Sequence, residues 1–265
     1  MSSLSVIIVN YRSGTILPAC LDSLIENAPA TDLEILVVNN DQERDLASIF
    51  PGNWPGTQFI QNPSNLGFAA AVNIGFRRSQ GEFVLLVNPD IVAQPRSLRA
   101  LVETHQLHPN AGIVMPRLSN PDGSLQYSCR RFYTFATLGL RRAPFQWLCP
   151  NYQRIREHLM LDWGHNCLEE VDWGLGAAMM IRRSSLEEGR IFDERFFLYF
   201  EDVDLCLRMW QRGWKVLYDP AACMMHRHRR DSANYWVHPA KWHHFRSMVK
   251  FIWKHRGKLG TRGKV

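Results

Sequence analysis

Apolar residues in the first half of the chain follow two alternating patterns. Short runs of β-branched and other apolar residues predict buried strands of a parallel sheet at 5–10, 33–38, 57–60, 83–87 and 113–115. Between these runs, apolar residues recur every three or four positions and predict helices at 16–25, 45–50, 66–78 and 95–108. Strands that alternate with helices in this way predict an α/β fold with a mostly parallel sheet flanked by helices.

Polar side chains follow three of the predicted strands. Asn10 and Tyr11 follow the first, Asn39-Asn40-Asp41 the second, and Asn88-Pro89-Asp90 the fourth. Asn and Asp are common turn residues, which explains any single cluster. Ligands of open α/β sheets, however, bind outside the carboxyl ends of the strands. Because three clusters fall at one edge, the pattern favours a ligand site there.

The second half of the chain is less regular. Turn residues within 116–137 predict a hairpin, and the aromatic and basic segment 138–170 indicates an insertion or lid over the site. The small-residue segment 171–181 enters a strand, in which Gly174 and Gly176 allow close approach of a ligand or of another backbone. A further strand is expected at 215–218, followed by a turn at Asp219-Pro220.

An acidic cluster follows an aromatic run at 196–200. Glu201, Asp202 and Asp204 fall in the first turn of a predicted helix. Acidic residues are stabilised at a helix N-terminus, and Asp204 can pair with Arg208, so the cluster has a purely structural explanation. Alternatively, a carboxylate that aromatic residues partly desolvate has a raised pKa and suits a general base. The stretch alone leaves both interpretations open.

Charge and hydropathy limit the class of protein. The 265 residues, 46% of them hydrophobic, can form one sizeable core, and no apolar run approaches a membrane span. The N-terminus lacks the features of a signal peptide, so we expect a cytoplasmic protein. There is no Walker A motif and no GxGxxG sequence. Six scattered cysteines indicate free thiols.

The C-terminal segment accounts for the positive sign of the net charge of +6. Residues 232–265 contain eight Lys/Arg and no Asp/Glu, whereas the rest of the chain is nearly neutral, which argues against nucleic-acid binding. Apolar residues recur there at helical spacing, with Lys241, Arg246, Lys250 and Lys254 between them: Trp242, Phe245, Val249, Ile252 and Trp253. This pattern predicts a basic amphipathic helix, which either binds an anionic membrane surface or docks on the core.

Asp90 is a candidate ligand for Mg²⁺ or Mn²⁺. Such ions are commonly held by one or two carboxylates together with substrate phosphates. His226 or His228 could add a nitrogen ligand, which would favour Mn²⁺, although histidines so spaced are more often surface residues.

Seven stretches carry a resemblance to a known family: SVIIVNYRSG (5–14), VVNND (37–41), NPSNLGFAAAVNIGF (62–76), LLVNPDI (85–91), PDGSLQYSCRRF (121–132), WGLGAAMMIRR (173–183) and FDERFFLYFEDVDLCLRMWQRGWKV (192–216). With them the chain resembles the inverting family 2 glycosyltransferases of the GT-A (Rossmann-like) fold, and in particular the bacterial rhamnosyltransferase-like subgroup. The stretches span most of residues 5–232. They are specific for the family and much less so for the transferred sugar.

The resemblance implies roles for individual residues. Asp202 matches the general base of the family's Glu-Asp motif, with Glu201 as a supporting or acceptor-binding group. Asn88-Pro89-Asp90 stands in place of the Asp-x-Asp metal motif, with Asn88 at its first position, so Asp90 is the expected metal ligand and His226 resembles the late His near the metal or diphosphate. The implied donor-binding residues are Asn10, Tyr11, Asn39, Asp41, Asn65, Gly67, Phe68, Asn73, Asn88 and Asp90. Asn39 stands where many members have Asp, which would alter the base contact. The acceptor-facing residues are Trp173, Gly174, Gly176 and Glu201.

The implied reaction is transfer of a sugar with inversion, with Mg²⁺ or Mn²⁺ as cofactor. The expected donor is dTDP-rhamnose, and the expected acceptor is a lipid-linked or polysaccharide glycan of the bacterial envelope, at the inner face of the membrane. A UDP-sugar or another dTDP-deoxysugar is the alternative donor, and a silent sugar-nucleotide-binding protein is the alternative class. We expect a glycosyltransferase domain at 1–232, with a nucleotide-sugar-binding half at 1–115 and an acceptor-binding half at 116–232, and a basic tail at 233–265.

Overall fold

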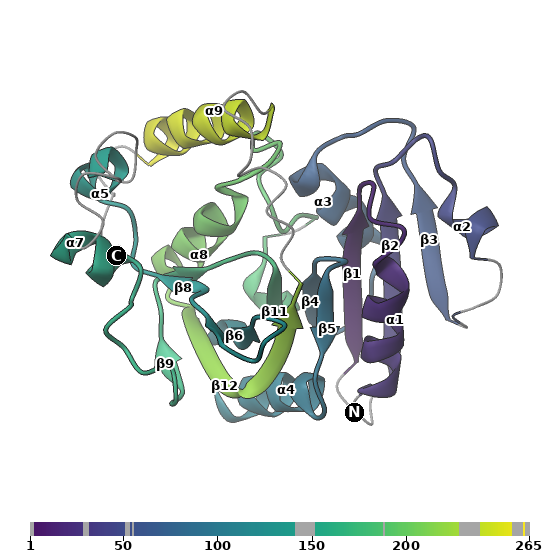
Figure 1. Ribbon diagram of the computed structural model, residues 1–265, viewed down its shortest axis with the longest axis horizontal. Coiled ribbons are helices and arrows are strands. Elements are labelled where there is room, and N and C mark those ends of the chain that lie inside the picture. Colours follow the sequence, from purple (N-terminus) through teal and green to yellow (C-terminus); the bar gives the residue numbers. More distant parts are fainter. Residues whose placement is uncertain are drawn as a thin grey trace.

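The computed structural model describes residues 3–28, 32–50, 54, 56–140, 152–187, 189–227, 239–255 and 262 (Figure 1). Its strands are β1 (Leu4–Asn10), β2 (Leu33–Asn39), β3 (Thr57–Gln61), β4 (Phe83–Val87), β5 (Ile91–Ala93), β6 (Ala111–Ser119), β7 (Leu125–Gln126), β8 (Cys129–Arg130), β9 (Glu169–Glu170), β10 (Trp173–Gly174), β11 (Ala178–Arg182) and β12 (Lys215–His226). Its α-helices are α1 (Leu17–Glu26), α2 (Leu46–Ile49), α3 (Phe68–Arg78), α4 (Ser97–Leu107), α5 (Phe135–Leu140), α7 (Gln153–His158), α8 (Glu201–Gln211) and α9 (Pro239–Lys254).

One large sheet organises the molecule. Its strand order is β3-β2-β1-β4-β11-β6-β12-β5, with β7 paired to β6 and β9 paired to β12. The pairs β1–β2, β1–β4, β2–β3 and β6–β12 are parallel, whereas β11 lies antiparallel between β4 and β6. The predicted α/β fold with a mostly parallel sheet is confirmed.

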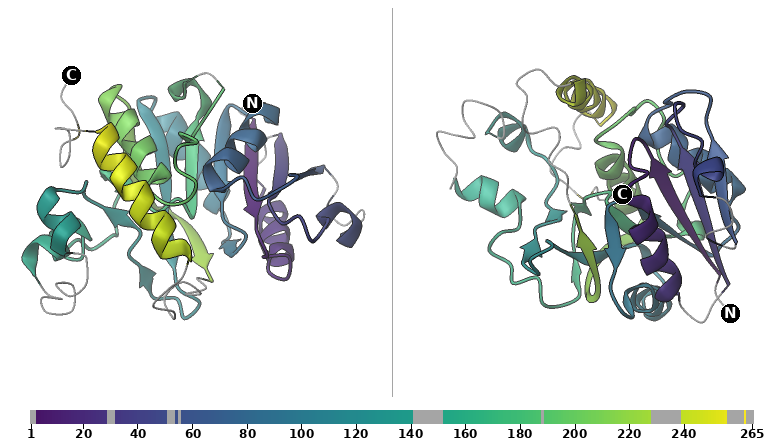
Figure 2. Two further views of the ribbon diagram at one scale, coloured as in Figure 1. Left: turned by 90° about the horizontal axis from the view of Figure 1, so that it is seen from above. Right: turned by 45° about the vertical axis from the view of Figure 1, so that its right-hand side comes forward.

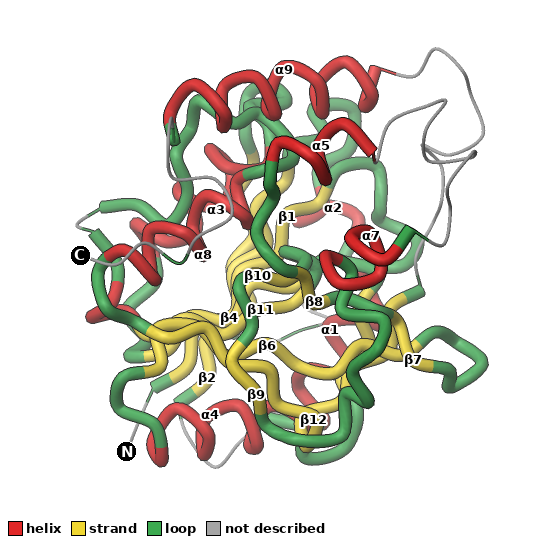
Figure 3. The backbone as a smooth tube through the Cα atoms, turned by 90° about the vertical axis from the view of Figure 1, so that its left-hand side faces the viewer, coloured by secondary structure: helices red, strands yellow, loops and turns green. Residues whose placement is uncertain are grey.

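Helices cover both faces of the sheet, which explains the continuous apolar strands. In β1, Ile7 and Val9 belong to the core that includes residues of α3 and α8, whereas Val6 and Ile8 belong to the core that includes residues of α1 and α4. Successive side chains of a strand point to opposite faces, so a strand covered on both faces must be apolar throughout. Figure 3 shows the strands as a central layer between α4 and α8.

The last strand is longer than the sequence suggested. The predicted strand at 215–218 continues to His226, because the residues at the expected turn form an irregularity inside β12 rather than its end. Asp219 Oδ1 accepts a hydrogen bond from the Ala221 N–H at 2.9 Å, and Asp219 Oδ2 accepts one from Thr104 Oγ1 at 2.6 Å. The strand then resumes its pairing with β6 and, through residues 224–226, pairs with β5, which was not predicted.

The predicted hairpin forms between β6 and β7, where Leu118 lies opposite Gln126 across a turn at 120–123. The segment 138–170 contributes α7, the end of α5 and β9, and residues 141–151 lie outside the described part of the chain. Its role as a lid stays a prediction.

The C-terminal helix α9 docks on the body of the protein (Figure 2). Phe251 is 1% exposed, and Lys254 Nζ lies 2.6 Å from Asp204 Oδ1 and 2.7 Å from Asp193 Oδ2. His255 Nε2 lies 2.7 Å from Asp204 Oδ1. Burial alone would raise the pKa of Asp204, but His255 and the neighbouring cations hold it below its ordinary value. The docked-helix interpretation is therefore confirmed, and membrane binding by the same helix stays a prediction. Among the described residues, no helix combines the length and the hydropathy that crossing a bilayer requires.

Candidate active site

The polar residues at the ends of β1 and β2 lie together. Asn10 Nδ2 donates a hydrogen bond to Asn39 Oδ1 at 2.7 Å, and the same oxygen accepts one from the Asp41 N–H at 3.1 Å. Asn39 is 1% exposed, whereas Tyr11 is 46% exposed. The hydrogen bonds of Asn39 therefore fix the shape of the loop that contains Asp41. The contact of this loop with a nucleotide base stays a prediction.

The loop before α3 approaches the aromatic run very closely. The Phe68 N–H donates to the Phe197 carbonyl at 2.8 Å, and a Cβ on Gly67 would lie 2.6 Å from that carbonyl oxygen. Gly67 has φ +86°, and its N–H donates to Asn65 Oδ1 at 3.0 Å. Glycine is required here by both the backbone conformation and the lack of space. The predicted donor loop thus supports the segment that precedes the acidic helix.

Asn73 lies deeper than the sequence suggested. Its side chain is fully buried, and its Oδ1 accepts hydrogen bonds from the N–H groups of Ile191 and Phe192 at 2.9 and 3.0 Å. Its Nδ2 donates to the Phe192 carbonyl at 2.8 Å. Asn73 therefore anchors the segment that leads to the aromatic run, and its predicted contact with the donor stays a prediction.

The acidic helix begins in an unusual backbone conformation. Tyr199 and Phe200 both have φ +68°, which is uncommon for residues with large side chains and costs of order 1–3 kcal/mol each. The Phe200 ring is buried and lies 5.4 Å from the Tyr133 ring and 5.5 Å from the Phe251 ring. This packing holds the turn that presents Glu201 and its neighbour at the start of α8.

Asp202 receives two main-chain hydrogen bonds. Its Oδ2 accepts from the Gly176 N–H at 3.1 Å, and its Oδ1 accepts from the Val203 N–H at 2.8 Å. Glu201 is 5% exposed, and its Oε2 is buried without a hydrogen-bond partner among the described residues. A buried carboxylate oxygen without a partner is uncommon, and the predicted acceptor-binding role of Glu201 stays a prediction.

The two carboxyl groups differ in their environments. Burial raises the pKa of Glu201 well above its ordinary value, and the charge of Asp202 raises it further. Burial also raises the pKa of Asp202, although the Gly176 and Val203 N–H groups and the nearby Arg130 oppose this shift. The hydrogen bonds that Asp202 accepts from the Gly176 and Val203 N–H groups favour its charged form, whereas Glu201 has no such support from other residues in the described part of the chain.

A second acidic group lies beyond β4. Asp90 Oδ2 lies 3.3 Å from His226 Nε2, because β5 pairs with the end of β12. Asp90 Oδ1 is buried and has no hydrogen-bond partner among the described residues. The structure thus brings together the two predicted metal ligands, whereas His228 lies outside the described residues.

Gln126 completes this arrangement and was missed by the sequence argument. Its Oε1 lies 2.7 Å from His226 Nδ1, across the β6–β7 hairpin. An Nδ1–H donated to Gln126 leaves the Nε2 lone pair facing the Asp90 carboxylate, an arrangement of two acceptors that suits a cation between them. Because this contact depends on how β7 pairs with β6, no local sequence pattern could have indicated it.

Two main-chain hydrogen bonds connect the acidic groups. The Asn88 N–H donates to the Ala177 carbonyl at 2.8 Å, and the adjacent Gly176 N–H donates to Asp202. The loop that carries Asp90 and the helix that carries Asp202 are therefore joined through one short segment. This segment follows Trp173 and Gly174, the other predicted acceptor-facing residues. Trp173 is 4% exposed, and Gly174 packs so closely against Met115 that a Cβ would lie 2.1 Å from its sulfur.

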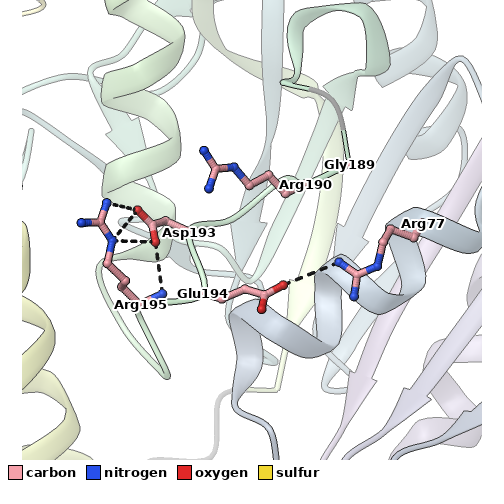
Figure 4. A pocket seen from close by; sticks show the side chains of 6 residues that line it. All are labelled: Arg77, Gly189, Arg190, Asp193, Glu194 and Arg195. Carbon is pink, nitrogen blue, oxygen red and sulfur yellow. Dashed lines mark hydrogen bonds and ion pairs between the residues drawn. The ribbon is translucent and has the colours of Figure 1, made fainter.

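The described cavities lie outside this constellation. One of about 490 Å³ lies beyond the C-terminal end of α3, and ion pairs such as Arg77–Glu194 cross it (Figure 4). Another of about 490 Å³ is lined by residues of the insertion, Arg131, Phe132, Thr134, Phe135, Ala136, Thr137, Arg154, Glu157 and His158. Neither of these two cavities is lined by Asp90 or Asp202.

Two bacterial relatives match most of the chain. The N-acetylglucosaminyl-diphospho-decaprenol L-rhamnosyltransferase of Mycobacterium tuberculosis is 29% identical over 236 residues, which cover 84% of this chain and 75% of that protein. The rhamnosyltransferase WbbL of Escherichia coli is 24% identical over 251 residues, 89% of each chain.

Solved structures share the fold. GalNAc-T7 with UDP, GalNAc and Mn²⁺ aligns with 96% of this chain and 48% of its own, at a TM-score of 0.67 and 15% identity. Staphylococcus aureus TarS in complex with UDP-GlcNAc aligns with 96% of this chain and 67% of its own, at a TM-score of 0.62 and 17% identity. These matches support the GT-A assignment of the sheet and its flanking helices. Residues 2–244 match the family described as "Glycosyltransferase like family 2", and the chain belongs to that family of glycosyltransferases.

Proposed function

We propose that this glycosyltransferase moves L-rhamnose from dTDP-rhamnose to a hydroxyl of a lipid-linked or polysaccharide acceptor, with inversion, in bacterial envelope glycan synthesis. The observation that carries the proposal is the short connection between the Asp90–His226 pair and Asp202 through Gly176 and Asn88. It supports a site that holds a diphosphate at one end and a proton acceptor at the other. Two relatives with rhamnosyltransferase names support the choice of sugar.

Asp202 is the proposed general base. Its raised pKa makes its carboxylate a stronger proton acceptor than an ordinary Asp, and its two main-chain hydrogen bonds fix its orientation. It would accept the proton of the acceptor hydroxyl while the oxygen attacks the anomeric carbon from the face opposite the diphosphate. Glu201, with its unpartnered Oε2, would bind an acceptor hydroxyl.

Mg²⁺ or Mn²⁺ fits the Asp90–His226 pair. The buried, unpartnered Asp90 Oδ1 is a free oxygen donor, and His226 Nε2 adds a nitrogen donor, which suits Mn²⁺. The described residues contain no group of three or more His, Cys, Asp or Glu side chains that could hold a metal, so phosphate oxygens of the donor would complete the coordination. A bound divalent ion would neutralise charge on the departing diphosphate. Gln126 would keep His226 in the tautomer that exposes Nε2.

The proposal also covers the location of the enzyme. We place it in the cytoplasm, at the inner face of the cell membrane, where a polyprenyl-diphosphate-linked acceptor would be presented. The basic residues of the C-terminal segment support attraction to an anionic surface.

A thermal-shift experiment tests the donor. A ligand that binds only the native state raises the unfolding midpoint, and the shift grows with the ratio of its free concentration to its Kd. We expect dTDP-rhamnose to raise the midpoint when Mn²⁺ or Mg²⁺ is present, and UDP-GlcNAc and UDP-galactose to leave it unchanged. The Asp90→Ala variant should lose the part of the shift that depends on metal. A higher midpoint with a UDP-sugar but not with dTDP-rhamnose would show that the donor is a UDP-sugar. An undiminished metal-dependent shift in Asp90→Ala would refute Asp90 as the metal ligand.

A transfer assay tests the reaction itself. A polyprenyl-diphosphate-linked N-acetylglucosamine is incubated with dTDP-rhamnose and metal, and the product is analysed by mass spectrometry and by NMR of the new anomeric centre. We expect addition of one deoxyhexose with an anomeric configuration opposite to that in the donor. A product with retained configuration would contradict the single displacement by way of Asp202.

A further inference from the structure

Helix α9 has two different faces. One face docks on the body: Ser247 Oγ donates a hydrogen bond to the Leu198 carbonyl at 2.8 Å, and Met248, Phe251 and His255 are buried. Ser247 and Met248 lie four and three positions before Phe251, and His255 follows it by four, so these residues share one face of the helix and its end. Figures 1 and 2 show the helix lying across the body beside α8.

The opposite face of α9 exposes large apolar side chains. Trp242 is 59% exposed, Phe245 43%, Val249 47% and Trp253 62%. Their spacing of three, four and four places them in one stripe, here called the α9 stripe, on the side away from Phe251. Every other described helix exposes at most one large apolar side chain, so this concentration is specific to α9.

Cations flank the stripe. Lys241 and Arg246 are exposed and lie at its margins, Lys250 donates a hydrogen bond to the Arg195 carbonyl at 2.6 Å, and α9 contains no acidic residue. Negatively charged lipid headgroups would pair with this basic border while the apolar stripe enters the layer beneath them, as in other interfacial amphipathic helices. Tryptophan side chains are also favoured at the boundary between water and hydrocarbon. We propose that the α9 stripe inserts into the headgroup region of an anionic lipid bilayer.

The position of α9 connects this surface to the active site. The His243 ring stacks on Phe197 with 4.6 Å between centroids, and Phe197 contacts the donor loop at Gly67. On the same helix, Phe251 packs on Phe200, the residue before Glu201. A bilayer under the stripe would therefore lie one helix away from the segment that carries the base. This placement deepens the proposed function and rests on it only for the acceptor, which would be a lipid-anchored glycan.

Vesicle flotation tests the surface. The full chain is mixed with vesicles of phosphatidylcholine containing phosphatidylglycerol, or with phosphatidylcholine alone, and the bound fraction is measured. We expect binding to the anionic vesicles that Trp242→Ser/Trp253→Ser weakens by about tenfold for each tryptophan removed. The matched control is Leu107→Ser, which removes an exposed apolar side chain from α4, and it should bind normally. The Lys241→Gln/Arg246→Gln variant should lose affinity only for the anionic vesicles, and this affinity should fall with salt.

Three results would overturn the proposal. The first is absence of binding to anionic vesicles, and the second is equal binding by the wild type and by Trp242→Ser/Trp253→Ser. The third is a dimer in light scattering without vesicles that becomes a monomer in this variant, because the stripe would then be a contact with a second copy. Unchanged unfolding midpoints would show that the substitutions leave the fold intact. Donor binding and transfer to a detergent-dispersed acceptor should persist in the variant, so failure of membrane binding is separable from failure of the proposed function.

Discussion

Replacing Asp202 by Asn tests the assignment of the base most directly. The amide has nearly the same shape, but it cannot accept a proton, and only one of its two terminal atoms can accept the hydrogen bonds that Gly176 and Val203 donate. Loss of a general base slows a reaction by about 10²–10⁴-fold, or about 2.7–5.4 kcal/mol in the barrier. One lost hydrogen bond to a charged group costs about 1.5–3 kcal/mol, but a buried charge beside Glu201 disappears with it. We therefore expect a large loss of rate with a change in unfolding free energy below about 2 kcal/mol.

The assay compares single-turnover transfer with donor affinity measured by calorimetry. Transfer in Asp202→Asn should fall within the range given above while donor affinity stays close to that of the wild type. The matched control is Asp204→Asn on the same helix turn, which breaks the buried contacts with Lys254 and His255 and should reduce stability rather than the rate in the folded state. The acid limb of the wild-type pH–rate profile should lie above the ordinary pKa of Asp, because the base must be ionised and its pKa is raised. A rate in Asp202→Asn within tenfold of the wild type, with normal donor affinity, would refute the assignment.

Three further substitutions test the structure around the base. Phe251→Ala should lower the unfolding free energy by about 3–5 kcal/mol in urea denaturation, since the ring is buried between α9 and the body, and a loss below about 1 kcal/mol would contradict the docking. Gly67→Ala should weaken donor binding and lower the melting temperature, because the new Cβ would collide with Phe197. Gly123→Ala is the control, since its φ of +82° is similar and the space around it is open, so it measures the backbone strain alone. Equal losses of melting temperature in the two variants would exclude the collision. Glu201→Gln should raise the melting temperature at pH 8 but not at pH 4. Because the pKa of Glu201 is raised in the folded protein, the protonated carboxyl stabilises the fold fully below its unfolded pKa, and this stabilisation is lost as pH rises through the folded pKa. A difference in melting temperature between Glu201→Gln and the wild type that did not change with pH would show that this buried carboxyl does not titrate in this way.

The first half of the fold could be read from the chain because local signals and tertiary packing agree there. A strand buried on both faces must be apolar throughout, so β1, β2 and β4 stand out from the amphipathic helices between them. The meeting of Asn10 with Asn39 also followed, because parallel neighbours end at the same edge. These inferences needed only the spacing of apolar residues along the chain and the position of polar residues at the strand ends.

Contacts between distant segments could not be read in the same way. Asp219-Pro220 has the composition of a turn, yet β12 continues past it because Thr104 and the pairing with β6 stabilise the irregularity. Gln126 reaches His226 only after the hairpin has formed. The sequence pattern of α9 fitted both a docked helix and a membrane-binding one; the structure confirms the docked face, and membrane binding by the opposite face is the proposal made above.

The position of β11 in the sheet has a consequence for how the chain is synthesised. The parallel strands β3, β2, β1 and β4 can pair as soon as they leave the ribosome, but the neighbour of β4 on its other side is β11, and β4 ends at Val87 whereas β11 begins only at Ala178. Throughout the synthesis of the intervening segment, the nascent protein would present an apolar edge strand with unpaired N–H and carbonyl groups, which is a template for aggregation. Chains truncated before Ala178 should therefore be insoluble even though they contain the whole predicted nucleotide-sugar-binding half, and a chaperone that covers strand edges would act during this interval.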